Sequence, residues 1–171
     1  MIQSRRPREA KPEAAGYRFG ILLSDYHPAV AEALLGGARR CLSAHGARSQ
    51  DQRVIRVPGA FEIPQAASRL AAEGRRRFDA LICLGVLIRG ETSHFDLLAQ
   101  EVCRGLGEVS RREGVPIAFG VLAVDNERQA RDRAGRGTSN KGWEAARAAI
   151  RMAILYAELD RAADVRVRRR G

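Results

Sequence analysis

LICLGVLIRGETSHFDLL, residues 81–98, indicates the class of fold more strongly than any other segment. Its first half is apolar at nearly every position, which is typical of a strand covered on both faces of a sheet. Its second half turns at Gly90 and continues with helical spacing from Phe95. A buried strand that leads directly into a helix indicates a parallel α/β sheet. The residues between strand and helix then stand at the carboxyl edge of that sheet, where such proteins bind ligands.

The same alternation of apolar strand and helix runs along most of the chain. Strands are predicted at residues 17–24, 53–57, 78–88 and 115–124. Helices are predicted at residues 29–46, 62–74, 95–114, 126–135 and 141–163. Because crossovers between parallel strands are right-handed and carry helices to both faces, the pattern predicts layers on each side of the sheet. The fold class is therefore α/β, a single-domain three-layer α/β/α sandwich with a four-stranded parallel sheet.

Length and composition agree with one globular domain. The chain has 171 residues, of which 45% are hydrophobic, enough for one core. We expect a flexible basic N-terminal arm at residues 1–16, a folded domain at 17–160 and a basic C-terminal tail at 161–171. No apolar run approaches the roughly 20 residues that span a bilayer, and no apolar segment follows the first basic residues as in a secretory signal. These observations predict a cytoplasmic protein without a membrane partner.

Charge and cysteine content narrow the function further. The formal net charge of +10 favours anionic partners such as phosphorylated substrates or nucleic acid. Aromatic residues make up only 5% of the chain and no RNA- or DNA-binding motif occurs, so specific nucleic-acid recognition is not expected. Cys41, Cys83 and Cys103 stand far apart without a CxxC pair, which argues against a disulfide framework or a zinc site. We expect all three to be small core residues.

Several common catalytic motifs are absent from the sequence. There is no Walker loop, no GxGxxG after the first strand, no GxSxG and no cluster with metal-ligand spacing. Nucleotide hydrolysis, dehydrogenase chemistry and serine-hydrolase chemistry are therefore disfavoured.

The loops after the first two predicted strands carry unusual residues. The stretch 24–28 could be an ordinary loop with a helix start at Pro28, but Tyr26 could equally offer a flat face to a ring. In the stretch 57–64, prolines flank a glycine that is followed by Phe61 and Glu62. Phe61 could belong to the core, and Glu62 could simply favour a helix N-terminus through the helix dipole. Backbone amides beside an acceptor carboxylate would equally suit a polyhydroxyl ligand.

The loop after the third predicted strand has the features of an anion site. Gly90 allows a tight turn, and a helix that begins near residues 92–94 presents free N–H groups and a positive dipole end, most simply to phosphate. Ser93 could be an ordinary N-cap with Asp96 three residues on. A lone histidine such as His94 is usually a surface residue, but beside an anion site it becomes a candidate acid–base group.

The arginine run at residues 128–133 is by default a solvated helix face. A guanidinium fits phosphate oxygens well, so one arginine could also reach the phosphate of a neighbouring site. The spacing alone does not select which arginine.

Four motifs together resemble the 6,7-dimethyl-8-ribityllumazine synthase family. They are VPGAFEIP (57–64), GVLIRGETSHFD (85–96), VPIAFGVL (115–122) and QARDRAG…NKG (129–142), in the same order and spacing. The resemblance runs from about Phe19 to Leu155. It implies a flavodoxin-like lumazine synthase domain and a transferase of riboflavin biosynthesis. The implied reaction condenses 5-amino-6-(D-ribitylamino)uracil with 3,4-dihydroxy-2-butanone 4-phosphate, and it implies no metal or organic cofactor.

The resemblance also implies roles for individual residues. His94 would move protons, and Arg133 would contact the phosphate from the side of the adjacent subunit. Gly90, Glu91 and Thr92 would hold the phosphate of the butanone substrate. The residues implied for binding ribitylaminouracil are Tyr26, Ala60, Phe61, Glu62, Val86, Leu87, Ile88, Phe119 and Lys141.

Some positions depart from the family pattern. Many members read Arg-Phe-Asn in the first loop, where this chain reads Asp25-Tyr26-His27. Tyr26 can still stack on the pyrimidine, but Asp25 and His27 change the local charge. Gly137 stands where a lysine or arginine is common, and Trp143 after NKG is unusual.

The resemblance further implies an oligomer. The family forms pentamers with sites between subunits, and some members build decamers or icosahedral shells. A short connection between the last two helices accompanies shell formation in the family. Residues 134–142 carry no insertion, so an icosahedral shell is compatible with the sequence. The implied partners are the small-molecule substrates, further copies of the chain and riboflavin synthase. The alternatives are a flavin- or lumazine-binding or shell-forming paralogue with weak catalysis, and a basic nucleic-acid binder.

Overall fold

The computed structural model describes residues 13–168 and shows the predicted alternation of strands and helices. The strands are β1 Phe19–Ser24, β2 Gln52–Val57, β3 Ala80–Ile88 and β4 Ile117–Val124. The helices are α1 Pro28–Ala44, α2 Glu62–Ala71, α3 His94–Glu113, α4 Glu127–Arg133 and α5 Lys141–Arg168, with short 3-10 turns η1 Ser49–Asp51 and η2 Gly74–Arg76. All four predicted strands and all five predicted helices are confirmed, with bounds that differ by a few residues at most ends.

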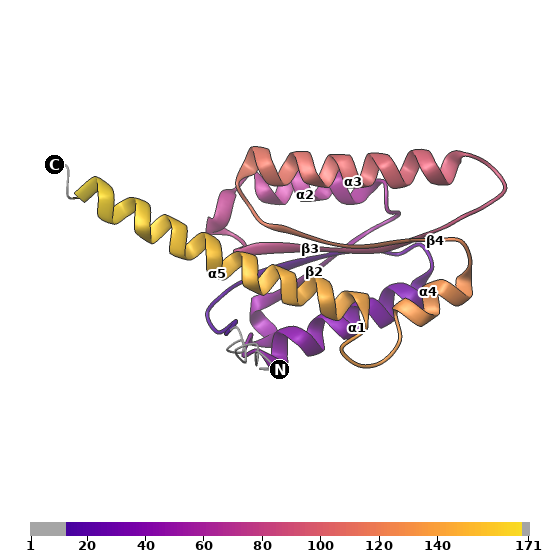
Figure 1. The fold of residues 1–171 in the computed structure, drawn as a ribbon, viewed down its shortest axis with the longest axis horizontal. Helices are drawn as coiled ribbons and strands as arrows, with labels where there is room; N and C mark the ends of the chain where they lie inside the picture. Colours follow the sequence, from indigo (N-terminus) through magenta and orange to yellow (C-terminus); the bar gives the residue numbers. More distant parts are fainter. Residues whose placement is uncertain (1–12, 169–171) are drawn as a thin grey trace, which may run out of the picture.

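The strands form one parallel sheet in the order β2-β1-β3-β4. Helices α2 and α3 cover one face, and α1, α4 and α5 cover the other (Figure 1). The predicted three-layer α/β/α sandwich is therefore confirmed. The chain leaves β1 towards β2 on one side and later crosses to β3 on the other, so the strand order reverses between β1 and β3. Such a reversal opens a crevice at the carboxyl ends of the strands.

Strand β3 lies in the centre of the molecule and explains its continuous apolar run. Every residue from Ala80 to Val86 is buried. Ile82 and Leu84 contribute to the core beneath α1 and α5, whereas Leu81 and Cys83 contribute to the core beneath α2 and α3. Successive side chains of a strand point to opposite faces, so a strand between two helical layers must be apolar at odd and even positions alike.

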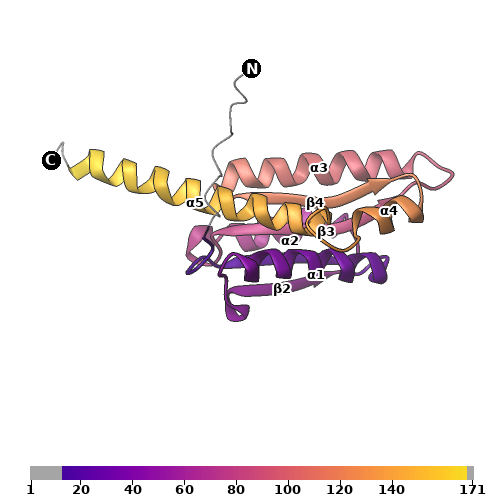
Figure 2. The same cartoon turned by 60° about the horizontal axis from the view of Figure 1, so that its bottom comes forward.

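The ends of the domain differ from the sequence prediction. Residues 1–12 of the predicted arm lie outside the described residues, but Ala14 is buried and its N–H donates to the carbonyl of His45 at 2.7 Å. At the other end α5 continues to Arg168 instead of ending near Ala163. In Figure 1 and Figure 2 its last turns extend beyond the layered body.

One of the three cysteines was wrongly predicted to be a core residue. Cys41 and Cys83 are buried, and burial raises the pKa of the Cys83 thiol. Cys103 is exposed on α3. Helical spacing placed it in a helix, but α3 packs only one face on the sheet, and Cys103 lies on the other.

No helix within residues 13–168 is both long enough and apolar enough to cross a membrane.

Candidate active site

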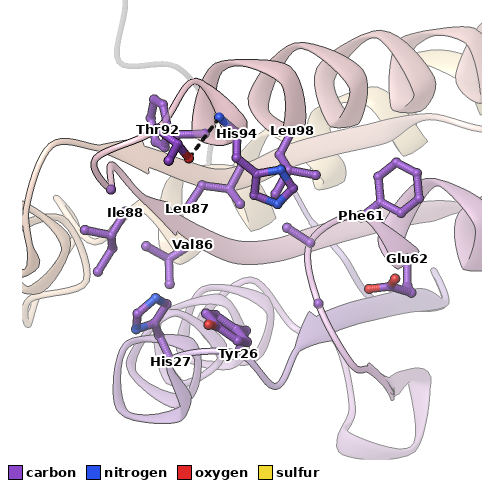
Figure 3. Close-up of a pocket in the computed structure, with 14 residues that line it drawn as sticks. Tyr26, His27, Phe61, Glu62, Val86, Leu87, Ile88, Thr92, His94 and Leu98 are labelled. Carbon is purple, nitrogen blue, oxygen red and sulfur yellow. Dashed lines mark hydrogen bonds between the residues drawn. The ribbon is translucent and has the colours of Figure 1, made fainter.

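A cavity of about 670 Å³ lies at the carboxyl edge of the sheet, where the strand order reverses. Loops that follow β1, β2 and β3 form its walls (Figure 3). Its lining residues are Tyr26, His27, Gly59, Ala60, Phe61, Glu62, Val86, Leu87, Ile88, Gly90, Thr92, His94, Phe95 and Leu98. The three loops are remote in sequence and meet because parallel strands all end at the same edge.

The loop after β1 places an aromatic ring at the mouth of the cavity. His27 adopts a left-handed backbone conformation, with φ +58°, and Pro28 then begins α1. The ring of Tyr26 is 67% exposed and meets the imidazole of His27 edge to face, 4.9 Å between centroids. An exposed ring on a fixed loop is available to stack on a flat ligand.

The charge of Asp25 is directed away from the cavity. Its carboxylate accepts from the Arg56 guanidinium at 2.7 Å, and Arg56 also pairs with Glu32 on α1. The Asp25 N–H donates to the carbonyl of Val57 at 2.9 Å, which fixes the loop to the end of β2. The carboxylate that departs from the family pattern at position 25 is therefore neutralised by an ion pair outside the cavity.

The loop after β2 supplies a second ring and a carboxylate. Phe61 is 46% exposed, so the interpretation of Phe61 as a core residue is wrong, while its neighbour Ala60 is buried. Glu62 begins α2 and folds its carboxylate over Gly59. A Cβ at position 59 would lie 2.9 Å from Oε2 of Glu62, so a larger residue there would push the carboxylate out of this position.

The loop after β3 presents unused hydrogen-bond donors. Helix α3 begins at His94 and the side chain of its N-cap residue Ser93 makes no capping hydrogen bond among the described residues, so Ser93 is not the ordinary N-cap that it could have been. The His94 N–H has only a long contact, 3.4 Å, to Oγ1 of Thr92. Among residues 13–168, no hydrogen-bond partner is found for the backbone N–H groups of residues 90–93. Free N–H groups at the positive end of a 20-residue helix favour an anion there.

The imidazole of His94 lies next to these donors and above the end of β3. In Figure 3 it projects from the start of α3 into the cavity, between Thr92 and Phe61 and over Leu87. The residue is exposed, so its ring can exchange protons with solvent and with a ligand in the cavity.

Three predicted site residues lie elsewhere. Phe119, Arg133 and Lys141 line a second hollow of about 370 Å³ beside the edge strand β4. Phe119 is 48% exposed there. Arg133 donates to the carbonyl of Gln129 at 3.3 Å, and Nζ of Lys141 pairs with Glu144 at 2.7 Å. Within one chain, Arg133 and His94 are thus not brought into the same cavity.

The buried side chain of Asn140 holds the segment that carries Arg133 and Lys141. Its amide nitrogen lies 2.7 Å from the carbonyl of Ala134 and 3.1 Å from that of Ala33. Its oxygen accepts from the N–H of Gly142 at 2.8 Å, near the start of α5. One polar side chain therefore joins the end of α4, helix α1 and the start of α5, and buried amides are stable only when paired in this way.

Sequence reasoning did not assign every residue that lines the cavity. Gly59, His27, Phe95 and Leu98 line it as well, whereas Glu91 was predicted and does not. Leu98 stands four residues after His94 on a helix, a spacing that puts both side chains on one face. In the sequence, His27 differs from the family pattern but carries no signal of a place in the cavity. Within residues 13–168, no group of three His, Cys, Asp or Glu side chains could hold a metal ion.

The fold and the cavity define a class of protein. It is a parallel α/β protein with an apolar, aromatic-rimmed cavity at its carboxyl edge, next to free helix N–H groups and an exposed imidazole. Such a cavity can hold a flat ring, an anion and a proton-transfer group side by side.

Comparison with known proteins identifies the family. The model of the 6,7-dimethyl-8-ribityllumazine synthase family matches residues 16–157. The 6,7-dimethyl-8-ribityllumazine synthase of Aquifex aeolicus is 48% identical over 151 residues, which cover 88% of this chain and 97% of the relative. That of Clostridium kluyveri is 44% identical over 152 residues, 89% of this chain and 97% of the relative. The chain belongs to the 6,7-dimethyl-8-ribityllumazine synthase family, as the resemblance of its motifs predicted.

Proposed function

We propose that the protein condenses 5-amino-6-(D-ribitylamino)uracil with 3,4-dihydroxy-2-butanone 4-phosphate to give 6,7-dimethyl-8-ribityllumazine, phosphate and water. The observation that carries the proposal is the position of His94, beside unpaired helix N–H groups and at the rim of the aromatic cavity. The similarity of the chain to synthases of that name over most of its length supports it.

The phosphate of the butanone substrate binds at residues 90–92. The N–H groups of this loop have no partner among the described residues and stand at the N-terminal end of α3. Backbone donors at a helix N-terminus bind phosphate without side-chain charge. Glu91 is part of this loop but is not among the residues that line the cavity, so its contribution is through its backbone.

His94 transfers protons between the two substrates. The amine of the uracil attacks the ketone carbon, which needs a base at nitrogen and an acid at the departing oxygen. In later steps the C–O bond to the phosphate group breaks, so that phosphate leaves, and the ring closes with loss of water. An imidazole can give and take protons in turn. Because the substrates already carry an amine, a ketone and a leaving group, positioning supplies much of the rate.

The ribitylaminouracil lies in the apolar part of the cavity. Tyr26 offers its ring at the mouth, and the end of β3 from Val86 to Ile88 forms the floor. Ala60, Phe61 and Glu62 border the side where the ribityl chain lies, and the Glu62 carboxylate accepts hydrogen bonds from its hydroxyls.

A complete site forms between two copies of the chain. Arg133, Phe119 and Lys141 line a separate hollow on the edge strand, so the first cavity receives these side chains only from another copy. The protein is accordingly a homo-oligomer, and a pentamer is the assembly that the family resemblance implies. Further stacking into a decamer or a shell, location in the cytoplasm and contact with riboflavin synthase stay predictions.

A two-substrate assay tests the reaction. Purified protein should form a product with lumazine absorbance, and His94→Ala and Arg133→Ala should each lose most of it. Arg131→Ala is the matched control, because Arg131 lies on the same helix and, among the described residues, pairs only with Glu127 at 2.9 Å. Absence of product from folded oligomer would overturn the proposal. Tight flavin binding without turnover would instead support the paralogue with weak catalysis, which the similarity to named synthases does not favour.

Mixing two inactive variants tests the shared site. His94→Ala and Arg133→Ala subunits, unfolded and refolded together, should regain part of the wild-type rate, because some sites then combine an intact histidine with an intact arginine. Each variant refolded alone is the control. If the mixture stays as inactive as the separate variants, the two residues act within one chain.

A further inference from the structure

Arg89 forms a clasp at the junction of β3 and α3. Its two terminal nitrogens donate to both carboxylate oxygens of Asp96, each at 2.9 Å. Its Nε donates to Oδ1 of Asp125 at 3.3 Å, and its guanidinium lies over the ring of Phe95, 4.3 Å from the centroid. The Arg89 N–H donates to the carbonyl of Val124 at 2.9 Å, at the end of β4. The side chain is thus held from several directions.

The clasp takes Asp96 out of its usual role. Asp96 is the third residue of α3, the position from which an acidic side chain can turn back to bond a free N–H group of the helix start. Here both oxygens of Asp96 accept from Arg89 instead, and Ser93 makes no side-chain cap among the described residues. The hydrogen bond from Arg89 is the main reason why the pKa of Asp96 is lowered.

A released carboxylate would compete with a phosphate group. Asp96 is separated from the loop 90–93 by only two residues, so its free carboxylate could accept from the same N–H groups. Its negative charge would also repel a phosphate at that distance, whereas the paired charge of Arg89 offsets it. Arg89 therefore affects the phosphate seat, by which we mean the N–H groups of residues 90–93. It does so without lining the cavity, since neither Arg89 nor Asp96 is among the lining residues.

We propose that Arg89 is a positioning residue for the phosphate seat, which keeps the carboxylate of Asp96 neutralised and away from the N–H groups of residues 90–93. This inference rests on the proposed function, since it assigns how the seat for the phosphate-bearing substrate is kept open. Arg89 acts through Asp96 and does not touch the reacting atoms.

Steady-state kinetics of three variants test the proposal. Arg89→Ala should raise KM for the butanone phosphate about tenfold or more and leave KM for the uracil within about twofold. The double variant Arg89→Ala/Asp96→Asn should regain most of the lost affinity, because the competing carboxylate is then gone. Asp96→Asn alone should bind at least as well as wild type, although it loses the same ion pair.

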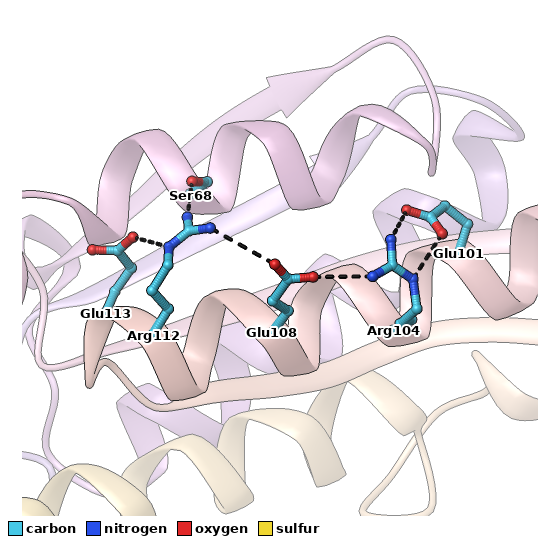
Figure 4. Close-up of polar contacts among 6 residues, drawn as sticks. All are labelled: Ser68, Glu101, Arg104, Glu108, Arg112 and Glu113. Atoms are coloured by element: carbon cyan, nitrogen blue, oxygen red, sulfur yellow. Dashed lines mark hydrogen bonds and ion pairs between the residues drawn. The ribbon is translucent and has the colours of Figure 1, made fainter.

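Arg104 provides the matched control. On the outer face of the same helix it pairs with Glu101 at 2.7 Å and with Glu108 at 3.0 Å, and Glu108 is linked in turn to Arg112 (Figure 4). Arg104 lies outside the cavity lining. Arg104→Ala removes a comparable arginine from α3 and should leave both KM values unchanged.

Binding of inorganic phosphate separates the clasp from the reaction. Isothermal titration of wild type and variants with phosphate should follow the same order as KM, even if the protein has no turnover. A loss of affinity in Arg89→Ala that Asp96→Asn does not relieve would overturn the proposal, because Arg89 would then contact phosphate itself or only support the fold. Equal loss of affinity for both substrates would overturn it as well. If Arg89→Ala does not fold, Arg89→Gln in both backgrounds gives the same comparison.

Discussion

Asn140 occupies the space that a side chain at Gly37 would need. A Cβ built on Gly37 would lie 2.0 Å from Oδ1 of Asn140, well inside van der Waals contact. Gly37 is in the middle of α1, where glycine costs about 0.5–1 kcal/mol relative to alanine. The close approach of α1 to the start of α5 explains why the chain tolerates a glycine in this helix.

Gly37→Ala should therefore destabilise the protein, although alanine is the better helix former. We expect a loss of about 1–3 kcal/mol from overpacking, measured by chemical denaturation. Gly36→Ala is the control with the opposite sign. A Cβ at Gly36 meets only the flexible tip of Arg40, so that variant should be neutral or slightly stabilising. Equal stability of the two variants would contradict the close packing.

Asn140→Ala should lower both stability and substrate affinity. The substitution leaves the carbonyls of Ala33 and Ala134 and the N–H of Gly142 without their side-chain partner. Unpaired buried groups cost about 1–3 kcal/mol each. The junction that carries Arg133 and Lys141 is then free to shift, so KM for the phosphate substrate should rise in the fraction that stays folded. A change of stability alone would show that the junction does not place those side chains.

His94→Gln should reduce kcat by about 100-fold to 10,000-fold, the usual contribution of a proton-transfer group. Glutamine keeps a polar side chain of similar reach but cannot act as an acid or a base. The thermal midpoint should not change, because His94 is exposed and its hydrogen bond to Thr92 is donated by its backbone N–H. A fall in kcat that follows a fall in folded fraction would argue against a catalytic role.

The ion pair between Arg89 and Asp96 should appear in the acid stability of the protein. Because the folded pKa of Asp96 is lowered by Arg89, the pair stabilises the fold above the ordinary aspartate pKa of about 4. That stabilisation is lost as the pH falls through the lowered pKa. Wild type should therefore be more stable than Asp96→Asn at neutral pH, and the two denaturation midpoints should converge in acid. A difference that persists at pH 2 would come from another contact.

Deletion of residues 161–171 should leave turnover within about twofold of wild type. The cavity lies at the carboxyl edge of the sheet, whereas this end of α5 extends past the opposite edge (Figure 2). There Arg75 pairs with Asp160 and lies 5.9 Å from the centroid of the Tyr156 ring. Arg75→Ala removes these contacts of α5, so it should lower the thermal midpoint of unfolding more than the deletion does. Loss of turnover in the deletion variant would place the end of α5 near a site.

Much of the fold was readable from the sequence because its causes are local. Apolar runs that fill both faces of a strand, and helical spacing between them, predict four parallel strands and five helices. This prediction does not depend on the order of the strands in the sheet. The run 81–88 followed by Gly90 also marks the carboxyl edge, so the loops that line the cavity could be predicted from the position of the strands. The motif resemblance added the family and the reaction, which spacing alone did not give.

How those loops meet depends on the packing of the folded chain. The order β2-β1-β3-β4, the separation of Arg133 from His94 and the pairing of Asn140 with α1 all join residues far apart in sequence. The clasp between Arg89 and Asp96 depends on the turn between them, and the exposure of Cys103 depends on which face of α3 meets the sheet. The helices and strands, and the chemistry of the residues at their ends, follow from the amino-acid sequence alone. The packing of crossovers and helices determined the distances, because a period in sequence specifies a face but not the neighbour that covers it.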